Sequence, residues 1–204
     1  MRYIGPKARQ CRREGINLFG SPKYQKIMTR RPGVPGLQGG KRAGKLSDYG
    51  KQLREKQKAK RMFCLSEKQF RRYFDKAARA SGVTGEVLFT LLEKRFDNAL
   101  YRAGFAMTRM QSRQFASHGL FLINGRRVDI PSYELSVGDV IEARPKSKTS
   151  AVFKNNFEEV EESNVPNWLK VDRKNLKIEV IALPTSDSFE HAVDPQMIVE
   201  FYSR

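Results

Sequence analysis

Cationic and amide side chains gather between residues 94 and 127, and their chemistry suits the binding of nucleic acid. Arg and Lys bind phosphate oxygens, whereas amides and an imidazole hydrogen-bond sugars or base edges. Folded RNA is recognised largely by its phosphates and its shape, so a compact surface of such groups would fit it. The candidate RNA-binding residues here are Lys94, Arg95, Arg102, Arg109, Arg113, Gln114, His118, Asn124, Arg126 and Arg127.

A second group of candidate cations lies earlier in the chain, where the charge is one-sided. The net charge is +17, and residues 1–61 hold 18 Lys and Arg against 3 Asp and Glu. Residues 151–204, by contrast, hold 6 against 10. Like charges repel within a compact state, so a polyanion is the expected counter-ion. The candidates are Arg12, Arg13, Lys51, Arg54, Lys58 and Arg61.

An anionic membrane is the other polyanion that such a chain could meet. A helix that spans a bilayer needs about 18 apolar residues, and no window of this sequence approaches that. Residues 1–6 also lack the apolar stretch of a secretory signal. We therefore expect a nucleic-acid partner, no membrane partner and no small-molecule substrate.

Spacings typical of metal sites do not occur in the sequence. Cys11 and Cys64 lie far apart, and neither His118 nor His191 has a neighbour at ligand spacing. We expect no metal and no cofactor. Two free thiols fit a reducing, intracellular compartment.

Asp97 is the carboxylate whose surroundings come nearest to a catalytic pattern. Arg95-Phe96-Asp97 is weakly similar to the segment around the catalytic aspartate of pseudouridine synthases, so an RNA-modifying enzyme is the alternative function. Asp97 also fits the first turn of a helix, where the dipole favours a carboxylate and Arg102 is near enough to pair with it. No P-loop, GxSxG or HExxH pattern is present, and we expect no enzymatic activity.

Helix and strand patterns that would position these groups begin at residue 46. Helix patterns follow a cap at Ser47-Asp48, a capping box of Ser66 with Gln69, a cap at Thr84 and a capping box of Thr108 with Gln111; a further helix covers residues 96–103. Asn124-Gly125 between apolar runs predicts a type I′ hairpin turn. Periodicity also predicts a helix over 150–160 and strands over 140–144, 177–180 and 198–202.

Residues 1–45 show no sustained pattern. They contain 8 of the 15 glycines and 4 of the 9 prolines, and their apolar residues are sparse. Such a segment cannot bury enough surface to offset its ordering entropy. We expect an extended basic arm that orders along RNA, with a disordered tail as the alternative.

The predicted fold class is α+β. We expect the arm at residues 1–45, followed by an α-helical domain of residues 46–93 that residues 151–204 complete. Residues 94–150 form an inserted small α/β module, in which a helix pair leads into a small antiparallel sheet.

Two stretches of sequence resemble a known family. Residues 46–58 read LSDYGKQLREKQK and residues 97–105 read DNALYRAGF, with shorter matches at Thr108-Arg109, Asn124-Gly125 and Gly138-Asp139. Further matches at 5–15, 166–172 and 198–203 extend the likeness over nearly the whole chain. The chain resembles the family of the bacterial small-subunit ribosomal protein "S four", which contains an RNA-binding module of the same name.

The resemblance implies a structural component of the small ribosomal subunit in the cytoplasm. It implies a primary binder of 16S rRNA that nucleates subunit assembly from the 5′ domain. The implied neighbours are ribosomal protein "S five", other small-subunit proteins and mRNA at the entry channel. A contribution to translational accuracy is implied in the same way.

The chain departs from the family pattern in the arm. Some members hold zinc there with four cysteines, whereas this chain has Cys11 alone in that region, so no zinc site is expected. The family's Pro-Gly-Gln-His-Gly element is replaced by Pro35-Gly36-Leu37-Gln38-Gly39, which lacks the His. The family's RNA contacts at that element are therefore not carried over.

Overall fold

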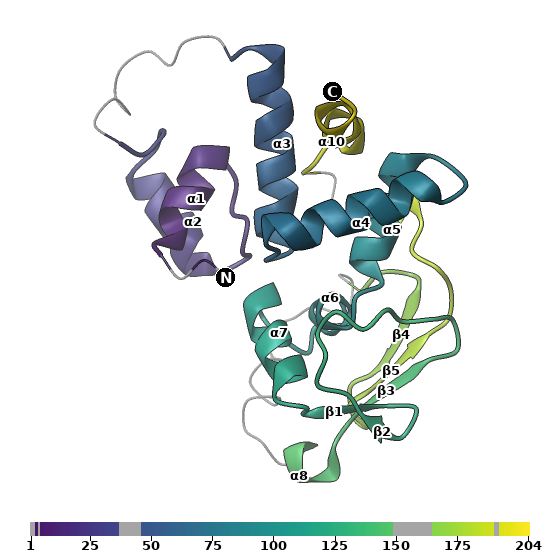
Figure 1. Ribbon diagram of the computed structural model, residues 1–204. Coiled ribbons are helices and arrows are strands. Elements are labelled where there is room, and N and C mark those ends of the chain that lie inside the picture. The colour runs from purple at the N-terminus through teal and green to yellow at the C-terminus, as the bar shows by residue number, and fades with distance from the viewer. Residues whose placement is uncertain (1–2, 4, 37–45, 149–164, 190–191) are drawn as a thin grey trace. The chain divides into compact units, whose positions relative to one another are not determined.

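The computed structural model describes residues 3, 5–36, 46–148, 165–189 and 192–204 (Figure 1). The chain forms two compact units, one of residues 1–88 with 190–204 and one of residues 89–189. Helices build the first unit, and helices with a small sheet build the second. The predicted α+β class is confirmed.

The start of the chain is a pair of helices rather than an extended arm. α1 (Lys7–Glu14) ends at Gly15, and α2 (Pro22–Arg30) has Pro22 in its first turn. Cys11, Leu18 and Phe19 are buried, and the Phe19 ring meets Tyr24 edge-on at 5.8 Å between centroids. The prediction of an arm without a core was wrong because these few apolar side chains are enough to close a two-helix layer.

The first unit continues with α3 (Asp48–Met62), a polar helix that packs against α10 (Pro195–Tyr202) (Figure 1). Ser47 Oγ accepts a hydrogen bond from the Gly50 amide, as the sequence predicted. The strand predicted over 198–202 is instead part of α10. Asp194 caps that helix through the Gln196 amide and Pro195 occupies its first turn, so the start signals overrode the alternating pattern.

α4 (Glu67–Arg79) and α5 (Thr84–Glu93) follow α3. The capping box of Ser66 and Gln69 is present as predicted. Phe70, Phe74 and Ala77 are buried along one side of α4, so the aromatic stripe is core. α5 passes from the first unit into the second between residues 88 and 89.

After the end of α5, the second unit continues with the predicted helix pair, α6 (Phe96–Arg102) and α7 (Arg109–Ser117). Thr108 caps α7 through the Gln111 amide, while the Gln111 side chain accepts from Met107 N rather than from the cap. β1 (Phe121–Ile123) and β2 (Arg126–Arg127) form the predicted hairpin. β3 (Val140–Ala143) then pairs with β1 and leads into α8 (Pro145–Lys148).

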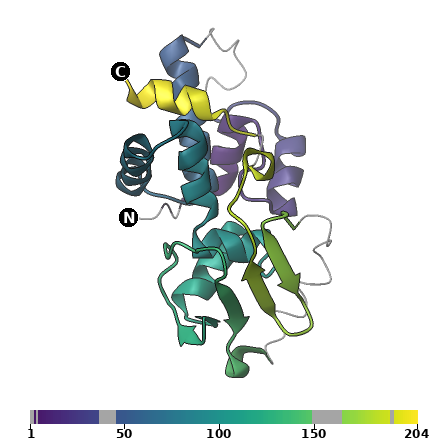
Figure 2. The same ribbon diagram turned by 90° about the vertical axis from the view of Figure 1, so that its right-hand side faces the viewer.

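Among the described residues, five strands form one antiparallel sheet in the order β2-β1-β3-β5-β4. β4 (Leu169–Asp172) and β5 (Lys177–Val180) come from the segment that we assigned to the helical domain. The pairing of β5 with β3 places them in the module's sheet instead; Figure 2 shows these yellow-green strands beside β3. One apolar core of the second unit contains Trp168, Ile178 and Val180 together with Phe96, Phe105 and Phe121. Further along the chain, a short 3-10 turn, η2 (Ser186–Ser188), lies at the end of this unit.

The helix predicted over residues 150–160 lies outside the described residues. Within the part that the structure describes, no helix combines the length and apolar character that crossing a membrane requires.

Candidate nucleic-acid interface

The β1–β2 hairpin presents two of the candidate cations, Arg126 and Arg127. Asn124 and Gly125 have φ values of 49° and 78°, as a type I′ turn requires. Both arginines are exposed on β2, which is an edge strand of the sheet. The hairpin therefore projects two positive charges from the rim of the unit.

The hairpin and α7 form a continuous surface because Arg127 crosses the end of the helix. A Cβ built on Gly119 would lie 2.4 Å from Arg127 Nε, and Gly119 has a φ of 61°, so glycine permits both the turn and the approach. Arg144 Nη1 also donates to the Gly119 carbonyl at 3.1 Å, where the helix dipole favours cations. We define the module surface as four exposed candidates, Gln114, His118, Arg126 and Arg127; Asn124 is exposed as well, but both ends of its amide are bonded within the fold.

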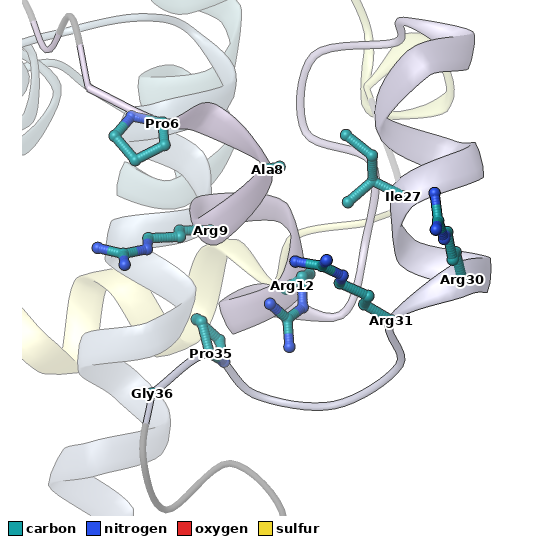
Figure 3. A pocket seen from close by; sticks show the side chains of 9 residues that line it. All are labelled: Pro6, Ala8, Arg9, Arg12, Ile27, Arg30, Arg31, Pro35 and Gly36. Atoms are coloured by element: carbon teal, nitrogen blue, oxygen red, sulfur yellow. The ribbon is translucent and has the colours of Figure 1, made fainter.

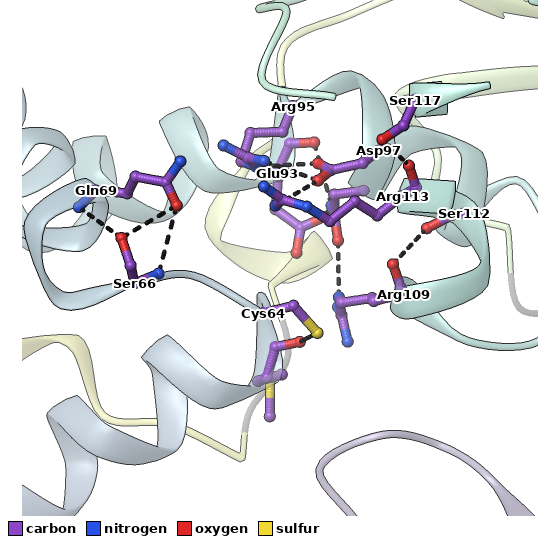
Figure 4. Close-up of polar contacts among 12 residues, drawn as sticks. Cys64, Ser66, Gln69, Glu93, Arg95, Asp97, Arg109, Ser112, Arg113 and Ser117 are labelled. Atoms are coloured by element: carbon purple, nitrogen blue, oxygen red, sulfur yellow. Dashed lines mark hydrogen bonds and ion pairs between the residues drawn. The ribbon is translucent and has the colours of Figure 1, made fainter. Parts of the chain in front are cut away.

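Two other candidates of the module, Arg95 and Arg113, bind the carboxylate of Asp97 (Figure 4). Asp97 Oδ2 accepts from Arg95 Nη2 at 2.7 Å and from Arg113 Nη1 at 3.3 Å, and its Oδ1 accepts from Arg95 Nε at 3.0 Å. The Arg95 side chain is 1% exposed and that of Arg113 is 19% exposed. Arg113 thus reaches the surface while Arg95 does not. The predicted partner of Asp97 was Arg102; the ion pairs found for this carboxylate are those with Arg95 and Arg113.

Arg102 instead pairs with Glu93, at 3.2 Å between Nε and Oε2, and donates to the Ser188 carbonyl. Arg109 is buried, donates to Asn98 Oδ1 at 2.9 Å and lies over the Tyr101 ring. These two guanidinium groups hold the helix pair to its neighbours in the fold. They are poorly placed to meet a phosphate.

Asn124 and Lys94 complete the module's candidates. The Asn124 side chain donates to Asp139 Oδ1 at 2.8 Å and accepts from Val140 N at 2.9 Å, so its amide fixes the hairpin to β3. Lys94 is half-buried between α5 and α6. Neither residue belongs to the module surface.

In the first unit, Glu14 gathers two candidate cations of α3 onto the end of α1. Its Oε1 lies 3.3 Å from Arg54 Nη1 and also contacts Arg61 Nη1. The Glu14 side chain is 1% exposed, and burial raises its pKa although both arginines act in the opposite direction. This buried carboxylate therefore holds α3 to the end of α1.

The remaining α3 candidates have acidic partners on their own helix. Lys51 Nζ lies 2.8 Å from Asp48 Oδ1 and is largely exposed. Lys58 Nζ lies 2.5 Å from Glu55 Oε1 and donates to the Ala192 carbonyl, which ties α3 to the chain before α10. Exposed pairs of this kind contribute little to stability, so Lys51 is the freer of the two to bind a ligand.

Sequence reasoning missed three cations that gather around Arg12. Arg9 and Arg12 on α1 line one cavity with Arg30 and Arg31 at the end of α2 (Figure 3). Arg9 and Arg12 are three residues apart, so a helical interpretation of residues 7–14 would have placed them on one side. Arg13, the remaining candidate, is exposed and donates to the Pro35 carbonyl at 3.3 Å.

The described residues show little that suggests metal or thiol chemistry. No group of three or more His, Cys, Asp and Glu side chains gathers as a metal site within them. Cys11 and Cys64 are not in a disulfide, and burial raises the pKa of the Cys11 thiol, which favours the inert protonated form.

Two family models match adjoining parts of the chain, which together run from residue 2 to residue 141. Residues 2–93 match the "Ribosomal protein S4/S9 N-terminal domain", and residues 94–141 match the "S4 domain". The boundary between the two matches falls where α5 ends and the helix pair begins.

Curated relatives match over their full length. The small ribosomal subunit protein uS4 of Persephonella marina is 47% identical over 203 residues, which is 99% of this chain and 98% of the relative. The protein of the same name from Chloroflexus aurantiacus is 47% identical over 206 residues, and that from Thermus thermophilus is 45% identical over 209. Each of these two matches covers 100% of this chain and 99% of the relative.

Proposed function

We propose a function from the premise that this chain belongs to the family of small ribosomal subunit protein uS4, as the full-length relatives and family models show. The protein is a structural, RNA-binding component of the small ribosomal subunit and has no catalytic turnover. It binds 16S rRNA early, nucleates assembly from the 5′ domain, and contacts protein "S five" and the mRNA entry region. The last three roles come from the family and extend beyond what the relatives' names state.

The exposed module surface is the observation that supports direct RNA binding. Arg126 and Arg127 project from an edge strand, and Gln114 and His118 lie beside them on α7. Cations on such a rim bind phosphates, and the neighbouring amide and imidazole supply hydrogen bonds to sugar or base edges. Arg113 of the same helix is 19% exposed while it pairs with Asp97.

The candidates whose side chains bond to other parts of the fold take a different part in this function. Arg95, Arg102 and Arg109 fix the helix pair and thereby orient the module surface, while Asn124 fixes the hairpin. Asp97 is engaged by two guanidinium groups, and this argues against its use as a catalytic carboxylate. The alternative of an RNA-modifying enzyme is therefore not favoured.

The test is the salt dependence of binding to 16S rRNA. Each neutralised phosphate lowers log K by about 0.7–0.9 per log unit of salt. We expect a steep slope for the intact protein, and a slope lower by about 1.4–1.8 for Arg126→Gln/Arg127→Gln if each arginine meets one phosphate. Lys170→Gln/Lys174→Gln is the control, because it removes the same charge at β4, the edge strand opposite β2, and at the turn after β4. It should leave the salt slope nearly unchanged.

A flat salt dependence of the intact protein would refute rRNA binding. Equal effects of the two double variants would refute the module surface as the RNA contact, while leaving membership of the subunit open to a sedimentation test. In that test the protein should travel with small subunits in stoichiometric amount.

A further inference from the structure

A cavity between α1 and α2 is lined by more positive charge than the fold can balance. It has a volume of about 410 Å³ and is bordered by Arg9, Arg12, Arg30 and Arg31 (Figure 3). In that view Arg31 extends from the end of α2 toward Arg12 on α1. The guanidinium groups of Arg12 and Arg31 therefore approach each other, and two such groups repel unless an anion lies between them.

The part of the chain that the structure describes supplies no acid that pairs with these four side chains. Glu14 is the one acidic residue among residues 1–47, and it is engaged with Arg54 and Arg61. Within the described residues no ion pair joins any of the four to a carboxylate, and the buried Arg12 Nε has no hydrogen-bond acceptor there. A buried donor without an acceptor is costly, so this atom points to a missing ligand.

The walls of the cavity indicate what kind of anion would fit. Pro6, Ile27 and Pro35 give it apolar sides, and its volume lies in the range of small-molecule sites and exceeds what a bare phosphate fills. A nucleotide has the matching parts, since its phosphate binds forked guanidinium groups and its ring or sugar packs on apolar side chains.

A second cavity favours a polymer over a free nucleotide. It has a volume of about 340 Å³ and shares Arg9, Pro35 and Gly36 with the first. Its other side carries Arg13, Arg54 and Arg61. Two cationic hollows that meet at a common wall suit consecutive phosphates of one strand.

We propose that the α1–α2 cavity holds a single nucleotide of the bound RNA, with its phosphate on Arg12 and Arg31 and the next phosphate in the adjoining cavity. The assignment rests on the proposed rRNA-binding function and adds a discrete subsite to it. Arg9 lies on the shared wall and serves both phosphates.

The test compares two double variants of the full-length protein in binding to 16S rRNA. Arg12→Gln/Arg31→Gln should weaken binding at least about tenfold and lower the salt slope by about 1 or more, through loss of charged contacts with phosphate. Lys23→Gln/Lys26→Gln removes the same charge from exposed positions of α2 outside the cavity, and should weaken binding less than about threefold.

Two controls separate a binding role from a folding role. Removal of the converging charges should leave the thermal midpoint unchanged or raise it, because repulsion is relieved. If Arg12→Gln/Arg31→Gln fails to fold, Arg12→Lys/Arg31→Lys carries the test, since it keeps the charge but loses the two-pronged contact and should still weaken binding several-fold. Ultraviolet crosslinking should add a nucleotide within residues 5–36 of the intact protein.

The outcomes distinguish the two proposals. If the intact protein does not bind 16S rRNA, the proposed function fails first. If it binds, but the two Gln variants weaken binding equally, the nucleotide subsite is refuted while the function stands. Titration with AMP and with inorganic phosphate tests whether the cavity binds a free small anion instead of a nucleotide of RNA. A micromolar, Arg12-dependent affinity for either compound alone would overturn the assignment to polymeric RNA.

Discussion

At the scale of single residues, Asp97 shows how a charged residue in a positive chain can be structural. Its carboxylate takes three hydrogen bonds from Arg95 and Arg113, and its side chain is 7% exposed. Arg95 is among the largest fully buried side chains of the described chain. Buried ion pairs contribute little net stability, but removing one partner leaves a buried charge that is poorly compensated.

We predict that Asp97→Asn destabilises the second unit by about 3 kcal/mol, because Arg95 loses the carboxylate that it holds by two hydrogen bonds. Urea unfolding followed by near-ultraviolet circular dichroism measures the change. Asp129→Asn, at an exposed position of the same unit, is the control and should stay within about 0.5 kcal/mol of the parent. A similar small effect of Asp97→Asn would show that the cluster does not stabilise the fold.

At the scale of elements, Glu67 joins three helices of the first unit. At the start of α4 it accepts from Lys56 and Lys60 of α3, each at 2.7 Å, and from the Tyr202 hydroxyl of α10 at 2.9 Å. Lys56 also lies over the Phe201 ring, 4.7 Å from its centroid. The pKa of Glu67 falls to about 2, because these hydrogen bonds outweigh the burial that would raise it.

This depressed pKa predicts an acid-sensitive junction. A carboxylate with a folded-state pKa below its ordinary value of 4.5 stabilises the fold above that pH, and the contribution is lost as pH falls toward 2. Glu67→Gln should therefore be less stable than the parent at pH 7, and the difference should shrink steadily between pH about 5 and about 2. Thermal melts across that range measure it, with Glu86→Gln at an exposed position of α5 as control. A difference that does not vary with pH would contradict the prediction.

Local signals predicted the elements of the module well. The Thr108 cap and the Asn124-Gly125 turn each act within four residues, so the sequence alone indicates α7 and the hairpin. The segment 198–202 was misassigned because its apolar residues fit both periods, although Asp194 and Pro195 marked a helix start. The burial of Arg95 and the pairing of β5 with β3 depend on contacts between distant segments, which no local pattern encodes.

At the scale of the whole molecule, a net charge of +17 on 204 residues sets the response to salt. Between about 0.01 M and 0.15 M salt the screening length falls from about 30 Å to about 8 Å, so self-repulsion in the free protein weakens. We predict that its thermal midpoint rises over this range by about 2–4 °C for each kcal/mol of repulsion removed.

The rRNA complex should respond in the opposite sense, because salt weakens its phosphate contacts. Differential scanning calorimetry of the free protein and of the complex, in sodium chloride and in choline chloride, separates screening from specific ion binding. If the thermal midpoint of the free protein fell with rising concentration of both salts, attraction rather than repulsion would dominate its charge interactions.

Two contacts between segments distant in sequence determine when each unit can fold during synthesis. β5 completes the sheet beside β3, and α10 packs on α3, although about 40 and 140 residues of chain separate the paired elements. Domains fold as their residues leave the ribosome, so both units wait for late segments before their cores close. A nascent chain interrupted before residue 177 would lack both Ile178, the cross-strand partner of Ile141 on β3, and Tyr202, whose ring packs on Phe74 of α4. Chaperones and proteases would thus recognise an unfinished chain before it could occupy an RNA.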